Sequence, residues 1–192
     1  DSIYTGKNSA NHGVFRLGHG TEVEATLFHD LHKAGLKQLL MCPMNAPDLN
    51  GFKNIDFIPD PWSGNRCAGD FISRQLDSVA KQSVNDNSAG KLTLSTYIRI
   101  FILMCWAFDA GKLFSVARTV VRSRKKKWLK AMVFEQILAL VSLKKMKDKF
   151  RYDFCSIFFN GIAHTQHHYL RSSKFVHSGA QLPEAVDPLE DC

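Results

Sequence analysis

The sequence predicts an α/β fold in which a layered core is interrupted by a helical insertion. Near the start, a helical pattern stops at Gly35 and is followed by the short apolar run of residues 37–42. Near the end, residues 154–159 form a second apolar run that contains three phenylalanines. Between the two runs, residues 71–149 have the spacing of helices. Short apolar runs separated by helical patterns are typical of layered α/β proteins.

The predicted core consists of residues 1–70 and 150–192, and the predicted insertion consists of residues 71–149. A chain of 192 residues is long enough to bury a hydrophobic core as one domain that carries an insertion. Because the chain lacks an initiator methionine and opens abruptly at Asp1, we expect it to be a fragment of a longer protein.

Turn residues dominate the first part of the predicted core. Residues 1–20 are rich in Gly, Asn and His, and we expect a loop there. Thr21 and Glu24 have the spacing of a capping box, so a helix is expected from Thr21 to about Ala34. The apolar run of residues 37–42 is then expected to be a strand.

The remaining elements follow from prolines, glycines and helical spacing. Residues 44–70 are expected to be irregular, with a short edge strand at residues 52–58. Residues 154–159 are expected to return to the sheet as a strand. Four helices are expected in the insertion, at residues 71–84, 93–109, 112–124 and 128–149.

Composition and cysteine usage limit the classes of protein to which the chain can belong. The chain has a net charge of +7 and a pI near 9.2, which permits an anionic partner without identifying one. Its five cysteines are odd in number, widely spaced and without a CxxC pair, so neither a disulfide framework nor a cysteine zinc cluster is expected. A reducing, cytoplasmic location is therefore favoured. The longest uncharged apolar run, residues 100–108, is too short to span a bilayer.

The richest group of ligand-capable side chains directly follows the last predicted strand. The segment Asn160–Tyr169 contains three of the eight histidines, His164, His167 and His168. Loops beyond the carboxyl ends of strands are where α/β proteins bind ligands, and a catalytic zinc takes nitrogen and oxygen ligands from such loops. The spacing does not match a standard zinc signature. Alternatively, these histidines bond backbone carbonyls or cap the next helix.

Three further features each permit a functional and a structural interpretation. Residues 118–130 contain seven Lys and Arg side chains, which suit phosphate groups or acidic lipid, although a solvated helix end is the favoured interpretation. The apolar residues 100–108 predict a central buried helix or, alternatively, the wall of a hydrophobic ligand site. Asp60-Pro61-Trp62 either presents a carboxylate and an aromatic ring to a substrate or forms a rigid turn. No phosphate-binding glycine loop and no GxSxG motif is present.

Two segments together resemble the alkaline phosphatase superfamily, and most closely its type I phosphodiesterase and nucleotide pyrophosphatase branch. Residues 2–14, with Thr5-Gly6 and His12-Gly13, resemble the family's TG-x-x-P-x-x-HG segment, which lies just after the nucleophile. Residues 160–164, Asn-Gly-Ile-Ala-His, resemble its D-x-x-G-H segment, whose Asp and His bind one of two metal ions. The order of the two segments and the long helical gap between them also fit this family.

The resemblance implies a partial alkaline-phosphatase-like core and a two-metal site for a divalent ion, with zinc as the expected metal. It implies that His164 is a metal ligand and that Asn160 is a weak ligand or a donor to a phosphate oxygen. His167, His168 and Tyr169 would line the substrate pocket. The helical insertion would act as a cap that selects the leaving group.

The chain also departs from the family pattern. The resemblance puts the nucleophilic Thr or Ser upstream of Asp1, and further metal ligands beyond Cys192. Ser9 stands where proline is usual, and Asn160 stands where the family has Asp. A neutral amide oxygen is a poorer ligand for a dication than a carboxylate, so the metal site is either altered or lost.

The sequence therefore predicts a fragment of a metal-dependent phosphoric ester hydrolase that acts on a small phosphate ester and is inactive on its own. One alternative is a basic helical module that binds an anionic polymer or a membrane surface through residues 118–130. Another alternative is a degenerate, non-catalytic family member, which Asn160 suggests. A nucleic-acid substrate is not expected, because no nucleic-acid motif accompanies the basic residues. The oligomeric state stays open.

Overall fold

The computed structural model describes residues 2–7, 11, 26–85, 93–109, 111, 113–114, 118, 128–149 and 152–160. By its internal contacts the chain divides into two compact units. The first unit comprises Asp1–Ala107 and Leu140–Phe158, and the second comprises Phe108–Ala139 and Phe159–Cys192. These two units do not test the predicted division of the chain into a core and an inserted cap, which stays a prediction.

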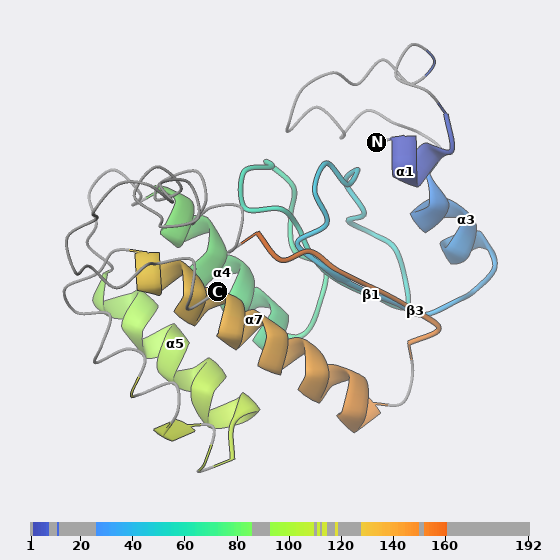
Figure 1. The fold of residues 1–192 in the computed structure, drawn as a ribbon. Helices are drawn as coiled ribbons and strands as arrows, with labels where there is room; N and C mark the ends of the chain where they lie inside the picture. Colours follow the sequence, from blue (N-terminus) through green and yellow to red (C-terminus); the bar gives the residue numbers. More distant parts are fainter. Residues whose placement is uncertain are drawn as a thin grey trace, which may run out of the picture. The chain divides into compact units, whose positions relative to one another are not determined.

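The first unit contains a three-stranded parallel sheet in the order β2-β1-β3 (Figure 1). The central strand β1, Gln38–Met41, is buried at all four positions. It pairs with β2, Ile55–Ile58, and with β3, Phe154–Ile157. All three strands lie within predicted runs, and β2 is an edge strand of this described sheet, as expected. The α/β fold class is confirmed.

Helix α3, Leu27–Lys33, ends as predicted but begins later than predicted. Gly35 has a positive φ of 74°, a conformation that suits glycine and that turns the chain from α3 into β1. The start predicted at Thr21 is wrong for this helix, because Thr26 has an extended backbone with φ −130° and ψ 164°. Residues 21–25, including the predicted capping box, lie outside the described residues.

The long helices match their predicted bounds within about two residues. They are α4, Phe71–Asn85, α5, Leu94–Ala107, and α7, Trp128–Lys149. The predicted helix at residues 112–124 lies mostly outside the described residues. The predicted loop at the chain start is wrong in part, since Ser2–Thr5 forms the one-turn helix α1. The predicted turn that follows it is confirmed, because Gly6 has a φ of 66°.

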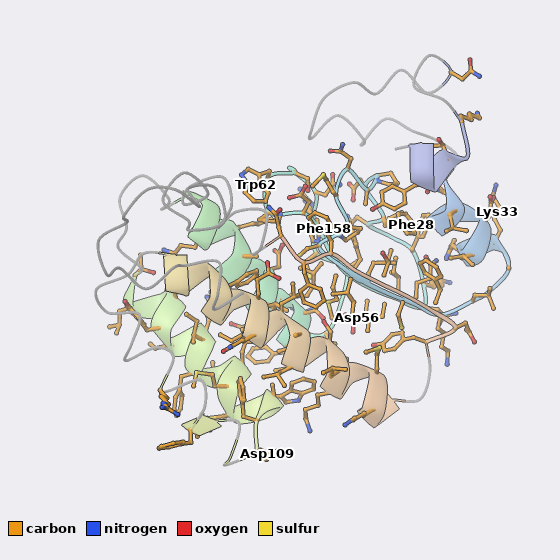
Figure 2. The ribbon with its side chains drawn as sticks, in the orientation of Figure 1. Phe28, Lys33, Asp56, Trp62, Asp109 and Phe158 are labelled. Atoms are coloured by element: carbon orange, nitrogen blue, oxygen red, sulfur yellow. The ribbon has the colours of Figure 1, made fainter. Side chains whose placement is uncertain are left out.

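Helices cover both faces of the sheet in the first unit. Successive side chains of a strand point to opposite faces, so Asp56 and Phe57 of β2 face different layers. Phe57 packs in the same hydrophobic cluster as Phe28 of α3. Asp56 instead bonds to Ser73 of α4 and to Lys145 of α7. Figure 2 shows Phe28 and Asp56 on their respective sides of the strands.

The cluster around Phe28 is the core on the α3 face of the sheet. It also contains Leu40 of β1 and two residues of the β1–β2 connection, Ala46 and Leu49. The ring of Tyr4 packs on Phe28 with 4.8 Å between ring centroids, which brings α1 onto the same core. The opening helix is thus part of the first unit.

The connection from β1 to β2, residues 42–54, contains no helix, in agreement with the predicted irregular stretch. Parallel strands need a long crossover, and here the turns of that crossover use left-handed backbone at Cys42, Asn45 and Asn54. The Asn65 side-chain amide donates to the Ala46 carbonyl at 2.9 Å and holds this crossover to the chain beyond β2. This hydrogen bond therefore holds together the loops that follow the carboxyl ends of β1 and β2.

Candidate functional site

The predicted site residues fall mostly outside the described residues. His164, His167, His168 and Tyr169 are among those not described. Asn160 is described, and its backbone N–H donates to Oε1 of Glu135 at 3.0 Å. Both residues belong to the second unit, so a carboxylate of α7 lies directly beside Asn160. Sequence reasoning did not single out Glu135, which has no signal beyond its place on a helix.

Asp60 is a second functional candidate, and it lies just beyond the carboxyl end of β2. It is buried, and its Oδ1 accepts the backbone N–H of Trp62 at 3.1 Å, while the backbone N–H of Asn45 also bonds to the carboxylate. The Ser63 hydroxyl donates to the Asp60 carbonyl at 2.7 Å. The rigid turn that was one interpretation of residues 60–62 is therefore present. Trp62 itself is exposed, so its ring remains accessible to a ligand.

Burial removes the Asp60 carboxyl group from most of its solvent. Burial raises the pKa of its carboxyl above the ordinary value, and the backbone bonds from Trp62 and Asn45 only partly oppose this shift. Burial and the charge of Asp60 together raise the pKa of the Tyr4 hydroxyl. The opening helix α1 therefore lies within electrostatic reach of the carboxyl end of β2. A desolvated carboxylate at this edge of a parallel sheet is the kind of group that functional sites contain.

A buried ionic network lies at the opposite, amino-terminal part of the sheet. Lys145 is fully buried, and its Nζ lies 2.6 Å from Oδ2 of Asp56 and 2.9 Å from Oδ2 of Asp70. The Tyr152 hydroxyl donates to Asp56 at 2.9 Å, and the Ser73 hydroxyl donates at 2.5 Å. Every oxygen of the Asp56 carboxylate thus has a donor. The network links β2, α4 and α7 with Tyr152, which lies two residues before β3.

The network also forms part of a helix cap and an aromatic contact. Asp70 precedes α4, and its Oδ1 accepts the backbone N–H of Ser73 at 2.9 Å, which is the geometry of an N-terminal cap. The Nζ of Lys145 lies 6.0 Å from the ring centroid of Trp106 in α5. Burial, together with the negative charge of Asp56 that accepts its hydroxyl, raises the pKa of Tyr152 well above its ordinary value.

A surface hollow of about 410 Å³ lies beside this network. Its lining includes Lys37, which precedes β1, together with Asn54 and Asp56 at the start of β2 and Tyr152 before β3. It therefore lies at the amino ends of the strands. Ligands of parallel α/β sheets bind at the carboxyl ends, so this hollow is not the predicted site. We interpret the network beside it as structural.

The described residues hold no group of three or more His, Cys, Asp or Glu side chains arranged to bind a metal. Of the predicted basic run, only Arg118 and residues 128–130 are described. Four cysteines in the described part of the chain are free thiols: Cys42, Cys67, Cys105 and Cys155. Within the same part, no helix has the length and apolarity needed to cross a membrane.

Comparisons with protein-family models, with curated proteins and with solved structures found no match. The fold and the described residues define an α/β chain with a parallel sheet, a structural ionic network at the amino edge, and a desolvated carboxylate at the carboxyl edge.

Replacing Lys145 by methionine should destabilise the chain by about 3–5 kcal/mol, because Asp56 would be left buried without its counter-charge. Urea denaturation followed by circular dichroism measures this loss. The matched control is Lys147→Met, an exposed lysine on the same helix, which should change stability by less than about 0.5 kcal/mol. Equal losses in the two variants would show that the buried network contributes nothing specific.

Gly69→Ala should destabilise the chain by about 1–3 kcal/mol. A Cβ at this position would lie 2.2 Å from Oδ1 of Asp56 and 2.7 Å from Cβ of Ser73, so the network would have to shift. Gly64→Ala is the control, because a Cβ there meets nothing within 4 Å. Thermal unfolding of both variants tests the close approach, and a tolerated alanine at position 69 would argue against the packing described.

Asp60→Asn should raise stability relative to the wild type as the pH increases from about 4. A carboxyl with a raised pKa in the folded state loses stability as pH rises, because the unfolded chain releases its proton first, and asparagine has no proton to release. Urea denaturation at several pH values gives the two curves. Asp48→Asn is the control, since Asp48 is exposed and accepts a similar turn bond from Asn50. Parallel stability curves for wild type and Asp60→Asn would contradict the desolvated charge.

Proposed function

We propose that the chain is part of a metal-dependent hydrolase of phosphate mono- or diesters, built on the plan of the alkaline phosphatase superfamily. The observation that carries the proposal concerns the carboxyl edge of the parallel sheet. The opening helix α1, within the first of the two family-like segments, lies in electrostatic reach of Asp60 at this edge. The second family-like segment follows β3, whose carboxyl end is at the same edge.

The end of β3 is well defined in the first unit. The Phe158 N–H donates to the Met41 carbonyl at 2.9 Å, so β3 remains paired with β1 up to its carboxyl end. Asn160 follows Phe158 by two residues along the chain, and His164 follows four residues later. Loops at the carboxyl ends of neighbouring parallel strands are the usual position of ligand-binding groups. This connectivity supports a ligand-binding role for the second family-like segment.

The proposed roles follow the donor chemistry of the residues. The His164 imidazole is a metal ligand, and the Asn160 side chain is a weak ligand or a donor to a phosphate oxygen. The carboxylate of Glu135, which accepts the Asn160 N–H, supplies the negative charge that an asparagine lacks at this position. Imidazole nitrogen with carboxylate and amide oxygen is a donor set that fits Zn²⁺.

When bound, the metal would act as a Lewis acid on the phosphoryl group. The chain's own residues would bind and orient the ester: His167, His168 and Tyr169 line its pocket and donate hydrogen bonds to its oxygens. The net charge of +7 attracts an anionic ester to the protein.

The alternative within the same family is a degenerate member that has lost its metal, and Asn160 is the residue that favours it. The two forms differ in how the metal affinity responds to a carboxylate at position 160. A redesigned site, in which Glu135 supplies the negative charge, binds metal in the wild type. A degenerate site binds metal only after a carboxylate is restored at position 160.

Zinc titration calorimetry of the chain should show binding that falls by at least about tenfold in His164→Ala and in Glu135→Gln. His32→Ala should leave the affinity unchanged, because His32 stacks on Phe52 in the first unit. Binding by Asn160→Asp alone, with none by the wild type, would favour the degenerate form. Absence of binding by all these variants would contradict a metal site at the end of β3.

Hydrolysis tests the activity itself. The full-length protein, with any residues that precede Asp1, should bind divalent metal and hydrolyse an aryl phosphate or an aryl phosphodiester. Activity should disappear with a chelator and return when zinc is added. A full-length protein that contains no divalent metal and hydrolyses neither ester would rule out the enzyme.

A further inference from the structure

The hollow at the amino ends of the strands contains part of an open sheet edge. Phe57 of β2 exchanges two backbone hydrogen bonds with Ala68, so its N–H and C=O point away from β1. Backbone groups alternate in direction along a strand, so the N–H and C=O of Ile55, two residues earlier, point to the same outer side. Ile55 and Ala68 both line the hollow.

The chain that bonds to β2 on this outer side leaves before it reaches Ile55. Ala68 forms an isolated bridge, and two residues later Asp70 caps α4. In the part of the chain that the structure describes, the outward N–H and C=O of Ile55 have no backbone partner. The hollow therefore presents one donor and one acceptor of a strand that a ligand can pair with.

An apolar wall beside this edge is held in place by the core. Phe52, Ile55 and Ala68 line the hollow, and all three pack against the core cluster around Phe28. The ring of His32 stacks on Phe52 with 4.1 Å between ring centroids. Because these side chains are already fixed, a ligand that contacts them has little ordering cost to overcome.

Two side chains of opposite charge also line the hollow. Lys37 lies just before β1, and among the described residues no carboxylate forms an ion pair with its ammonium group. Asp70 lies two residues beyond Ala68, and its side chain is 35% exposed although it bonds to Lys145. A ligand that carries an ammonium group and a carboxylate matches both charges.

We propose that the hollow binds a short zwitterionic peptide of two or three residues, whose first residue pairs with the backbone of Ile55. The peptide ammonium donates to the Ile55 carbonyl and lies near Asp70, and the first peptide carbonyl accepts the Ile55 N–H. The terminal carboxylate bonds to Lys37. Pairing with an open sheet edge is a recurring mode of peptide recognition. This proposal is independent of the hydrolase proposed above.

The dimensions of the hollow suit a ligand of this length. Neighbouring strands lie about 4.8 Å apart, and an extended dipeptide spans about 7 Å, so one peptide reaches from Ile55 to the ammonium of Lys37. A volume of about 410 Å³ is at the small end of the range for ligand sites. Ala68 occupies the next pairing position on β2, so the paired residue is the first of the peptide.

Charge favours a peptide over a nucleotide. Asp56 and Asp70 both line the hollow, and their two carboxylates oppose the entry of a phosphate group. A terminal carboxylate carries a single charge and lies at the Lys37 end of the ligand.

The apolar run of residues 100–108 does not contribute to this site. No residue of α5 lines the hollow. Helix α5 is buried along one face only, at residues such as Leu103 and Ala107, whereas Leu94 and Phe101 are exposed. The predicted central buried helix is therefore wrong.

Two-dimensional ¹H–¹⁵N nuclear magnetic resonance of the chain during titration with the dipeptide leucyl-alanine tests the proposal. The Ile55 amide proton should shift downfield as it gains an acceptor, and the signals of Lys37 and Asp70 should shift with the same dissociation constant. Acetyl-leucyl-alanine lacks the ammonium group and leucyl-alanine amide lacks the carboxylate. Each should bind at least about tenfold more weakly than leucyl-alanine.

One variant tests the carboxylate contact on the protein side. Lys37→Met should weaken leucyl-alanine binding by about tenfold and leave the affinity for leucyl-alanine amide unchanged. The bond from the Lys37 N–H to Asp153 does not use the side chain, so the fold should persist, which circular dichroism checks. Lys53→Met is the matched control, because Lys53 is exposed and does not line the hollow. It should bind like the wild type.

Four results would overturn the proposal. Leucyl-alanine at about 10 mM that leaves the Ile55 signal in place would exclude pairing at this edge. Equal affinity for the three peptides would remove the role of the two charges. Equal loss in Lys37→Met and Lys53→Met would reduce the effect to net charge. Adenosine monophosphate that shifts the Ile55 signal at lower concentration than leucyl-alanine would assign the hollow to a nucleotide.

Discussion

The ion pair between Asp56 and Lys145 is the constraint on which the described sheet depends. An ammonium group as deeply buried as that of Lys145 has to remain with its carboxylates, because an uncompensated charge there would destabilise the fold by several kcal/mol. The pair fixes α7 against β2, and through the Tyr152 hydroxyl it also fixes the chain just before β3. A hydrogen bond from the Lys37 N–H to the Asp153 carboxylate at 2.8 Å connects the residues just before β1 and β3, and it adds to the same alignment.

The ionic network and the candidate functional carboxylate of Asp60 lie at opposite ends of the strands. The amino edge of the sheet holds the satisfied network, and the carboxyl edge holds Asp60, whose charge is desolvated and whose pKa is raised. Because strands aligned at one edge are also aligned at the other, the network determines where the loops after β1, β2 and β3 begin. The position of the Asp60 turn beyond β2 thus depends on the ionic network at the other end of the strands.

The sequence predicted the elements with strong periodicity and missed the features that depend on distant partners. The run around β1 and the long helices α4, α5 and α7 were found because apolar spacing and Gly35 mark them locally. Asp56 and Lys145 are 89 residues apart, and neither an aspartate inside a strand nor a lysine on a helix reveals its partner. The exposed face of α5 was missed because a uniformly apolar helix does not show which face is covered. Helix α1 was missed because one turn carries no periodic signal.

The central claim is that the segment after β3 binds a divalent metal ion. Nuclear magnetic resonance of the chain during titration with Mn²⁺, a paramagnetic divalent ion, measures this most directly. The account predicts that the backbone signals of Glu135, Asn160 and His164 broaden together at low metal concentration. Broadening confined to exposed carboxylates such as Asp48, with none at His164, would contradict it.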